Sequence, residues 1–242
     1  MSGMNRTSHF ANLAGLAYMK FNKKLTDKLK KLGYTTVKYI DKGGAQVIYL
    51  SNKKEQVLTF RGTEPKQMSD ISADLKAWKI RAKTDGMVHD GFYDEVEKIW
   101  LDILPLIHDK TPLYICGHSL GGAMATVAAS RLERHTKCLY TFGSPRVGNK
   151  KFVEGLKVKH FRWRNNNDLV PSVPFSWMGF RHHGTPCYFN YYGHVRNGLS
   201  GYQRFKDWWR GHVKAVSKFE LFDGFRDHSK KYYIRYSKEN KL

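Results

Sequence analysis

One stretch near the middle of the chain, residues 113–123, constrains the fold more than any other. It reads Leu-Tyr-Ile-Cys-Gly-His-Ser-Leu-Gly-Gly-Ala, an apolar strand, a sharp turn and a helix that begins with small residues. Ser119 stands at the centre of a Gly-x-Ser-x-Gly pattern. In this strand–turn–helix context the pattern predicts a serine nucleophile, because Gly117 and Gly121 allow a tight turn that pushes the hydroxyl out of the backbone.

The hydrophobic periodicity of the chain predicts an α/β fold. Residues 9–33 have helical spacing on two neighbouring segments, and residues 37–60 read as a meander of three strands. After the Ser119 stretch we expect a helix at 120–134, strands at 138–142, 158–163 and 186–189, and a helix around 232–236. This alternation predicts a mostly parallel sheet with helices on both faces. Without an internal repeat or linker, residues 1–242 are expected to form a single domain.

Charge is the second strong feature of the sequence. The 42 lysines and arginines outnumber the 21 acidic residues, which gives a formal net charge of +21. Such a field favours an anionic partner, namely nucleic acid, an anionic lipid surface or an acidic protein. No apolar run is long enough to cross a bilayer, and no Sec signal is recognisable, so we expect a cytoplasmic location or export by a non-Sec route. The three cysteines lack metal-ligand spacing and are expected to be small buried thiols.

A serine nucleophile needs a base, and the base needs an acid that fixes its tautomer. A serine on such a strand–turn–helix segment is said to lie on a nucleophile elbow. In proteins with this elbow the catalytic partners follow along the chain in the order serine, acid, histidine. Asp168, in a polar loop after the expected strand 158–163, is the best-placed carboxylate. The residues alone leave several later histidines open as the base, with His228 somewhat favoured: His182, His183, His194, His212 and His228. His89 and His118 are expected to be structural.

Several separate motifs resemble those of the class 3 lipase family, the fungal-type triacylglycerol lipases and their bacterial relatives. They stand in the family's order: Phe-Arg-Gly-Thr at 60–63, Val-His-x-Gly-Phe at 88–92, Gly-His-Ser-Leu-Gly-Gly-Ala at 117–123, Tyr-Thr-Phe-Gly-Ser-Pro-Arg-Val-Gly-Asn at 140–149, Asn-x-x-Asp-Leu-Val-Pro at 165–171, and Asp-His at 227–228. The resemblance implies an α/β-hydrolase fold with Ser119 as nucleophile, Asp168 as acid and His228 as base. It also implies an oxyanion hole formed by Thr63 and the backbone N–H of Leu120, and neither a cofactor nor a metal.

The segment after Thr63 has two interpretations. Met68, Ile71, Leu75 and Trp78 lie at the spacing of one helix face, which fits either core packing or a short lid over the site. The rest of the segment is polar, unlike a strongly interfacial lid, and this weakens the expectation of a long-chain triacylglycerol preference.

The sequence therefore predicts a serine carboxylic-ester hydrolase, a lipase or esterase, that cleaves fatty-acyl esters of glycerides through an acyl-enzyme. The charge suggests an alternative, phospholipase A-type activity with peripheral contact to an anionic membrane surface. A remote alternative from another class is a nucleic-acid-binding protein on a degenerate hydrolase fold, with Trp208, Trp209 and Phe219 as stacking groups.

Overall fold

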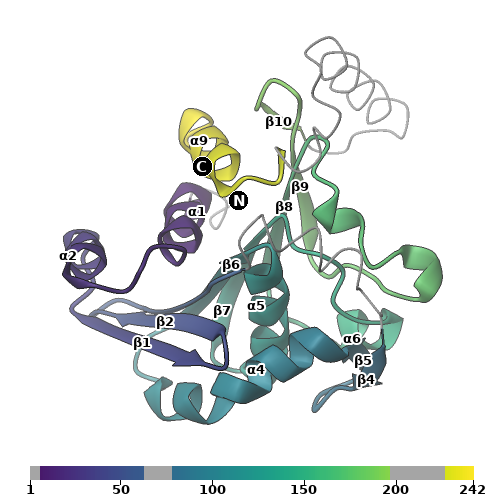
Figure 1. Cartoon of the computed structure of the whole chain (residues 1–242), viewed down its shortest axis with the longest axis horizontal. Helices are drawn as coiled ribbons and strands as arrows, with labels where there is room; N and C mark the ends of the chain where they lie inside the picture. Colours follow the sequence, from purple (N-terminus) through teal and green to yellow (C-terminus); the bar gives the residue numbers. More distant parts are fainter. Residues whose placement is uncertain (1–5, 63–77, 197–226) are drawn as a thin grey trace.

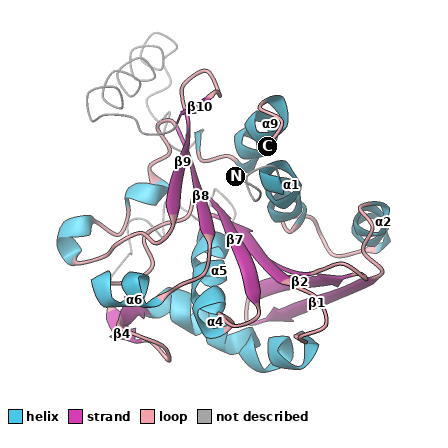
Figure 2. Ribbon diagram, turned by 180° about the vertical axis from the view of Figure 1, so that it is seen from behind, coloured by secondary structure: helices cyan, strands magenta, loops and turns pink. Residues whose placement is uncertain are grey.

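A twisted sheet of eight strands forms the centre of the molecule (Figures 1 and 2). The computed structural model describes residues 6–62, 78–196 and 227–242. In order across the sheet, the strands are β1 (Thr36–Lys42), β2 (Ala45–Ser51), β3 (Gln56–Phe60), β6 (Leu113–His118), β7 (Thr136–Phe142), β8 (His160–Asn165), β9 (Thr185–Phe189) and β10 (Val195–Arg196). Strands β3, β6, β7, β8 and β9 are parallel, which confirms the mostly parallel sheet.

The predicted meander is also confirmed. Strands β1, β2 and β3 pair antiparallel in chain order. Gly43 and Gly44 connect β1 to β2, and both have the positive φ (+56° and +85°) that a two-residue hairpin turn requires. Because β3 then pairs in parallel with β6, the meander forms one end of the sheet and leaves β6 near its centre.

Helices cover both faces of the sheet, as predicted. They are α1 (Thr7–Leu16), α2 (Lys23–Lys31), α4 (Asp90–Ile103), α5 (Leu120–Arg131), α6 (Lys150–Gly155) and α9 (Lys230–Glu239), with short 3-10 turns η2 (Leu104–Leu106), η3 (Val170–Ser172) and η4 (Ser176–Met178). Helices α1 and α9 lie side by side on one face, so close that a side chain on Gly15 would collide with Ile234. Helices α4 and α5 pack on the other face.

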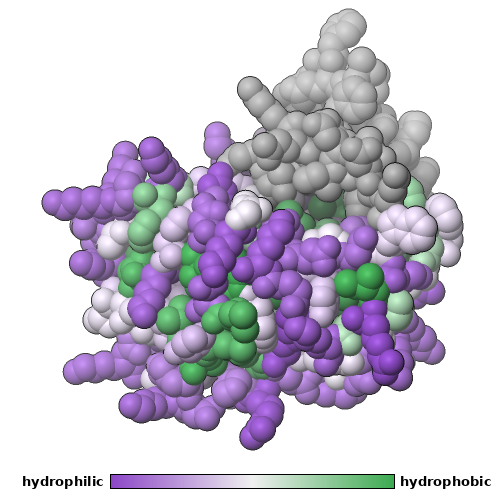
Figure 3. Space-filling model, turned by 60° about the horizontal axis from the view of Figure 1, so that its bottom comes forward, coloured by the Kyte–Doolittle hydropathy of each residue, from purple (hydrophilic) through white to green (hydrophobic). Residues whose placement is uncertain are grey.

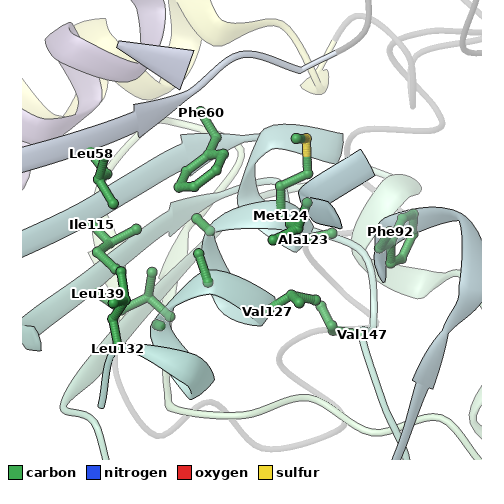
Figure 4. Packing of buried hydrophobic residues seen from close by; sticks show 14 of the residues in the cluster. Leu58, Phe60, Phe92, Ile115, Ala123, Met124, Val127, Leu132, Leu139 and Val147 are labelled. Atoms are coloured by element: carbon green, nitrogen blue, oxygen red, sulfur yellow. The ribbon is translucent and has the colours of Figure 1, made fainter. Parts of the chain in front are cut away.

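Alternation along the parallel strands divides the core into two clusters. Leu58, Ile115 and Leu139 point towards α5, where they meet Ala123 and Val127 (Figure 4). Their strand neighbours point to the opposite side and pack with α1 and α9: Val57, Cys116, Tyr140 and Trp163. All three cysteines are free and buried, as predicted.

Some elements differ from the sequence-based expectation. Strands β4 (Lys79–Arg81) and β5 (Met87–His89) form a small separate hairpin, and α6 follows β7; neither was predicted. These elements have three to six residues, too few to establish a periodicity. Helix α5 ends at Arg131 rather than at 134, because Leu132 leaves the helical conformation (φ −105°, ψ 25°) and the chain turns towards β7.

Hydrophilic residues dominate the face shown in Figure 3, where hydrophobic residues form small separate groups. This distribution agrees with the mean hydropathy of −0.58. Among the described residues, no helix has both the length and the apolar character required to cross a bilayer.

Candidate active site

Ser119 lies on a strained turn between β6 and α5. Its φ of 60° and ψ of −132° are unusual for a residue with a side chain, and its N–H donates a hydrogen bond to the Phe142 carbonyl (2.9 Å). The predicted reason for the flanking glycines is confirmed by the packing. A Cβ on Gly117 would collide with the backbone of Gly121, and a Cβ on Gly121 would collide with the backbone carbonyl of Phe60. Strand β6, helix α5 and the end of β3 therefore meet at the serine.

The polar loop after β8 brings Asp168 to the same edge of the sheet. Because β6, β7 and β8 are parallel, the residues that follow them gather at their carboxyl ends, the usual location of ligand sites in such sheets. The Asp168 side chain is fully buried, and the Nδ1 atom of His228 lies 2.9 Å from each of its carboxylate oxygens. The structure thus joins two of the predicted residues across 60 positions of sequence.

This contact defines the tautomer of His228. A carboxylate only accepts hydrogen bonds, so Nδ1 carries the ring proton and donates a hydrogen bond to Asp168. In the neutral ring Nε2 is then a base, and it is buried without a hydrogen-bond partner among the described residues. An imidazole oriented by an acid, with its second nitrogen unpaired, is the arrangement that activates a hydroxyl nucleophile.

Asp168 has two further hydrogen-bond donors. The Val170 N–H donates to Oδ1 (2.9 Å), and the Tyr233 hydroxyl donates to Oδ2 (2.5 Å). Burial, together with the Asp168 charge, raises the pKa of Tyr233 well above its ordinary value, so the phenol remains a donor. The sequence analysis placed Tyr233 in a helix without assigning it to the site.

The backbone around His228 is tied to the end of β8. The Asn165 amide donates to the Asp227 carbonyl (2.8 Å), and the Asn166 amide donates to the Asp227 carboxylate (3.0 Å). The asparagine run therefore holds the acid loop and the base in one unit. From the turn-forming composition of residues 165–167, the sequence analysis predicted only a loop.

His118 contacts the backbone of His228, the predicted base. Its Nε2 donates to the His228 carbonyl (2.7 Å), and its Nδ1 accepts from the Tyr18 hydroxyl (2.8 Å). Burial, followed by the charge of His228, lowers the pKa of His118 well below its ordinary value, so the ring is neutral as this tautomer requires. The expected structural role is thus a specific one, which connects the elbow to the loop before α9.

Gly143, directly after β7, leaves the space that Asp168 and His228 occupy. It has a φ of +59°, and a Cβ there would come within 2.9 Å of His228 and 2.7 Å of Asp168. A side chain at this position would occupy the space of the acid–base pair. The glycine in the Phe-Gly-Ser-Pro motif is therefore required by the site.

Part of the predicted oxyanion hole can be located. Leu120 is the first residue of α5, so its N–H has no acceptor within the helix and lies beside Ser119. Gly62 is next to the elbow, since a Cβ on it would lie 3.2 Å from Cβ of Ser119. Thr63 follows Gly62 but falls outside the described residues, as do the candidate lid residues Met68, Ile71 and Leu75.

The other candidate histidines have different surroundings. His182 contacts the Pro171 carbonyl through Nε2 (2.7 Å), and His183 contacts His160. His194 is exposed on the loop between β9 and β10, and His212 lies outside the described residues together with Trp208, Trp209 and Phe219. The described part of the chain contains no cluster of three or more His, Cys, Asp or Glu side chains that could hold a metal ion.

The fold is that of an α/β-hydrolase, and a buried histidine–aspartate pair lies at the edge of the sheet that carries Ser119. A family model described as Lipase (class 3) matches residues 57–178, half of the chain. The chain belongs to the class 3 lipase family.

Similar proteins agree with this assignment. Toxin TseL of Vibrio cholerae serotype O1 is 39% identical over 127 residues, which are 48% of this chain and 20% of the toxin. A lipase of Rhizopus niveus is 30% identical over 175 residues, 65% of this chain and 43% of that lipase. The crystal structure of a lipase from Rhizopus microsporus var. chinensis superimposes with a TM-score of 0.66 at 25% identity and covers 77% of this chain and 74% of its own. The chain thus spans less than half the length of the curated relatives it matches.

Proposed function

We propose that the protein is a serine carboxylic-ester hydrolase that cleaves fatty-acyl esters of glycerides. The observation that carries the proposal is the contact of His228 Nδ1 with both oxygens of buried Asp168, which leaves Nε2 unpaired at the sheet edge where Ser119 sits on its strained turn. Lipases among the similar proteins support an acyl-lipid ester as the substrate class.

In this proposal the reaction has two halves. The Ser119 oxygen attacks the ester carbonyl while His228 Nε2 takes the hydroxyl proton, and the carbonyl oxygen becomes an oxyanion. The Leu120 N–H, with Thr63 as the second predicted donor, stabilises that charge. Collapse of the intermediate breaks the ester bond, and His228 gives its proton to the leaving alcohol. Water then attacks the acyl-enzyme with His228 again as base, which releases the fatty acid and restores Ser119.

Replacement of Ser119 by alanine tests the proposal. We expect hydrolysis of p-nitrophenyl esters to fall by at least about 10³-fold, because the covalent step is lost. The native chain should also gain the mass of one phosphonyl group when treated with a fluorophosphonate, and the Ser119→Ala variant should not.

A matched control is Ser51→Ala, at the end of β2, which should retain both properties. Ester hydrolysis that survives in a folded Ser119→Ala variant would show that another group is the nucleophile.

Peripheral contact with an anionic membrane is the second proposal, and one segment favours it. Leu169, Phe175 and Trp177 are exposed by 49%, 49% and 80%, and the latter two rings are stacked. Arg181 lies on the same segment and is exposed, with its guanidinium bound to the Ser176 carbonyl. Apolar rings beside a cationic group suit the boundary between lipid headgroups and acyl chains. This segment begins one residue after Asp168, so contact there brings lipid to the proposed site.

A further inference from the structure

One face of β8 carries basic side chains where a core strand usually carries apolar ones. Phe161 and Trp163 point into the cluster packed by α1 and α9. Because side chains alternate along a strand, His160, Arg162 and Arg164 share the opposite face. Both arginines are only partly exposed. The strand thus places two guanidinium groups next to each other, near the edge that leads into Asp168.

A third arginine joins them from the neighbouring loop. Arg146 follows β7, and its guanidinium donates to the carbonyls of Ser172 and Pro174. Burial and then the charge of Arg164 lower the pKa of both Arg146 and Arg162, the latter to about 10. Both charge effects come from Arg164, which lies two residues from Arg162 on the same face of β8, while Arg146 follows the end of the adjacent parallel strand β7. With a pKa of about 10, Arg162 remains positively charged at neutral pH.

No counter-charge balances this cluster within the described part of the chain. Arg162 and Arg164 form no ion pair with a described carboxylate, and the Nε atom of each is buried without an acceptor. A buried N–H donor is usually paired, since removing it from water without a new partner is costly. Two of these neighbouring cations, Arg162 and Arg164, therefore each have a buried Nε–H group without an acceptor among the described residues, and an anion could accept from both groups.

We propose that Arg146, Arg162 and Arg164 bind a phosphate-type oxyanion. Guanidinium groups present planar pairs of N–H donors that match phosphate oxygens, and a tetrahedral phosphate group accepts donors from several directions at once. The anion would come either from the headgroup of a glycerophospholipid or from free phosphate. The first source rests on the proposed hydrolase function and makes phospholipids a substrate class.

The location supports a link to the catalytic edge. Arg164 is one residue before the end of β8, and its charge acts on the Tyr233 phenol, which binds Asp168. The loop tied down by Arg146 is the segment 172–174, which directly precedes the exposed rings of Phe175 and Trp177. A phosphate held here would therefore lie between the exposed aromatic segment and the acid–base pair.

Thermal unfolding with inorganic phosphate tests the site without any catalysis. Against sodium chloride of equal ionic strength, saturating phosphate should raise the Tm of the native chain by about 3 °C or more. The Arg162→Gln/Arg164→Gln double variant should lose this response. Arg134→Gln, which removes the same kind of charge from an exposed position after α5, should keep it.

The single variants separate binding from a structural role. Without phosphate, Arg162→Gln and Arg164→Gln should each unfold at or above the native Tm, because each removes an unbalanced charge. A marked fall in Tm would show that the arginines support the fold and would overturn the proposal. A native Tm that does not respond to phosphate would overturn it as well.

Lipid hydrolysis then identifies the source of the anion. In mixed micelles with one nonionic detergent, a headgroup site predicts that the double variant loses at least about tenfold in kcat/KM for phosphatidylglycerol but less than about twofold for diacylglycerol. A free-phosphate site predicts equal effects on both lipids with the native Tm response intact. If no lipid or soluble ester is hydrolysed, the proposed function fails, while the Tm response still decides whether the anion site exists.

Discussion

At the scale of single residues, the Asp168 carboxylate receives hydrogen bonds from His228, Val170 and Tyr233. The hydroxyl of Tyr233 also accepts the N–H of Asn165, so one phenol joins the acid to the strand that carries it. Because these groups are buried, each hydrogen bond fixes the direction of the carboxylate more strongly than it would in water. We infer that Tyr233 is a positioning residue for the proposed triad.

The variant Tyr233→Phe tests this role. Without the Tyr233 hydroxyl, the Asp168 carboxylate loses one hydrogen-bond donor. Its negative charge then stabilises the His228 imidazolium more strongly. We expect kcat to fall about tenfold and the acidic limb of kcat/KM to move to higher pH. Tyr232→Phe, on the same helix, is the control. A lower Tm with an unchanged pH–rate profile would indicate that Tyr233 contributes only to stability.

The sequence predicts residues of the candidate site where a motif carries the information. The pattern around Ser119 and the serine–acid–histidine order lead to Asp168 and, with the family resemblance, to His228, and the structure brings the latter two together. Tyr18, His118 and Tyr233 could not be assigned their contacts. Their hydrogen-bond partners are 65 to 110 positions away in the sequence, and a local sequence pattern does not predict contacts between residues so far apart.

At the scale of elements, the segment from Leu169 to Arg181 is short of regular structure but firmly attached. The Lys79 ammonium donates to the Met178 carbonyl (2.7 Å), and the Arg181 N–H donates to the Gly148 carbonyl (2.7 Å). These contacts hold Trp177 outward on a fixed backbone. A rigid aromatic anchor loses little conformational entropy when it enters a lipid interface.

We therefore expect Trp177→Ala to weaken binding to phosphatidylglycerol vesicles by roughly tenfold, the effect of no longer burying one large apolar side chain. Vesicle co-sedimentation measures this change, and Ser119→Ala can serve as the background so that lipid is not consumed. Leu101→Ala is the matched control, because Leu101 is 77% exposed on α4. Equal binding by native chain and Trp177→Ala would contradict docking through this segment.

The sequence predicts those helices and strands that are long enough for their apolar residues to repeat at a regular spacing. The meander, the two N-terminal helices and α5 follow from apolar spacing. The β4–β5 hairpin does not, since Ile80 and Val88 are the only apolar pair that faces across it. Its position depends on tertiary contacts, such as the hydrogen bond from His89 N–H to the Val147 carbonyl.

At the scale of the whole molecule, burial keeps many histidines neutral. It is the leading cause that lowers the pKa of six of them: His9, His89, His118, His160, His182 and His183. The pKa of His182 falls to about 2, with the charge of Arg162 as the second cause. These buried histidines therefore add no positive charge to the interior, where a protonated ring would repel the neighbouring arginines.

Acid should destabilise the protein earlier than its carboxylates alone would require. The unfolded chain binds a proton at each of these histidines near pH 6.5, whereas the folded chain does not, so the free energy of unfolding falls as pH drops below 6.5. Each suppressed histidine contributes up to about 1.4 kcal/mol per pH unit. Urea unfolding at several pH values measures the slope.

Two variants check the assignment. His160→Gln should flatten the slope by about one such contribution, since His160 is buried and its pKa is lowered well below the ordinary value. His194→Gln, at an exposed position, should leave the slope unchanged. A free energy of unfolding that is constant between pH 7.5 and 5.5 would contradict the neutral state of these rings.

The contact of the elbow with the loop before α9 has a consequence for the time at which the proposed chemistry becomes available. A ribosome makes Ser119 and its turn roughly 5 to 20 seconds before it makes His228, given typical elongation rates. During this interval the nascent chain holds an unactivated hydroxyl, because His118 lacks the carbonyl it binds and Asp168 lacks its imidazole. In the proposed mechanism, the order of synthesis therefore delays ester hydrolysis until the loop that carries His228 and helix α9 have docked.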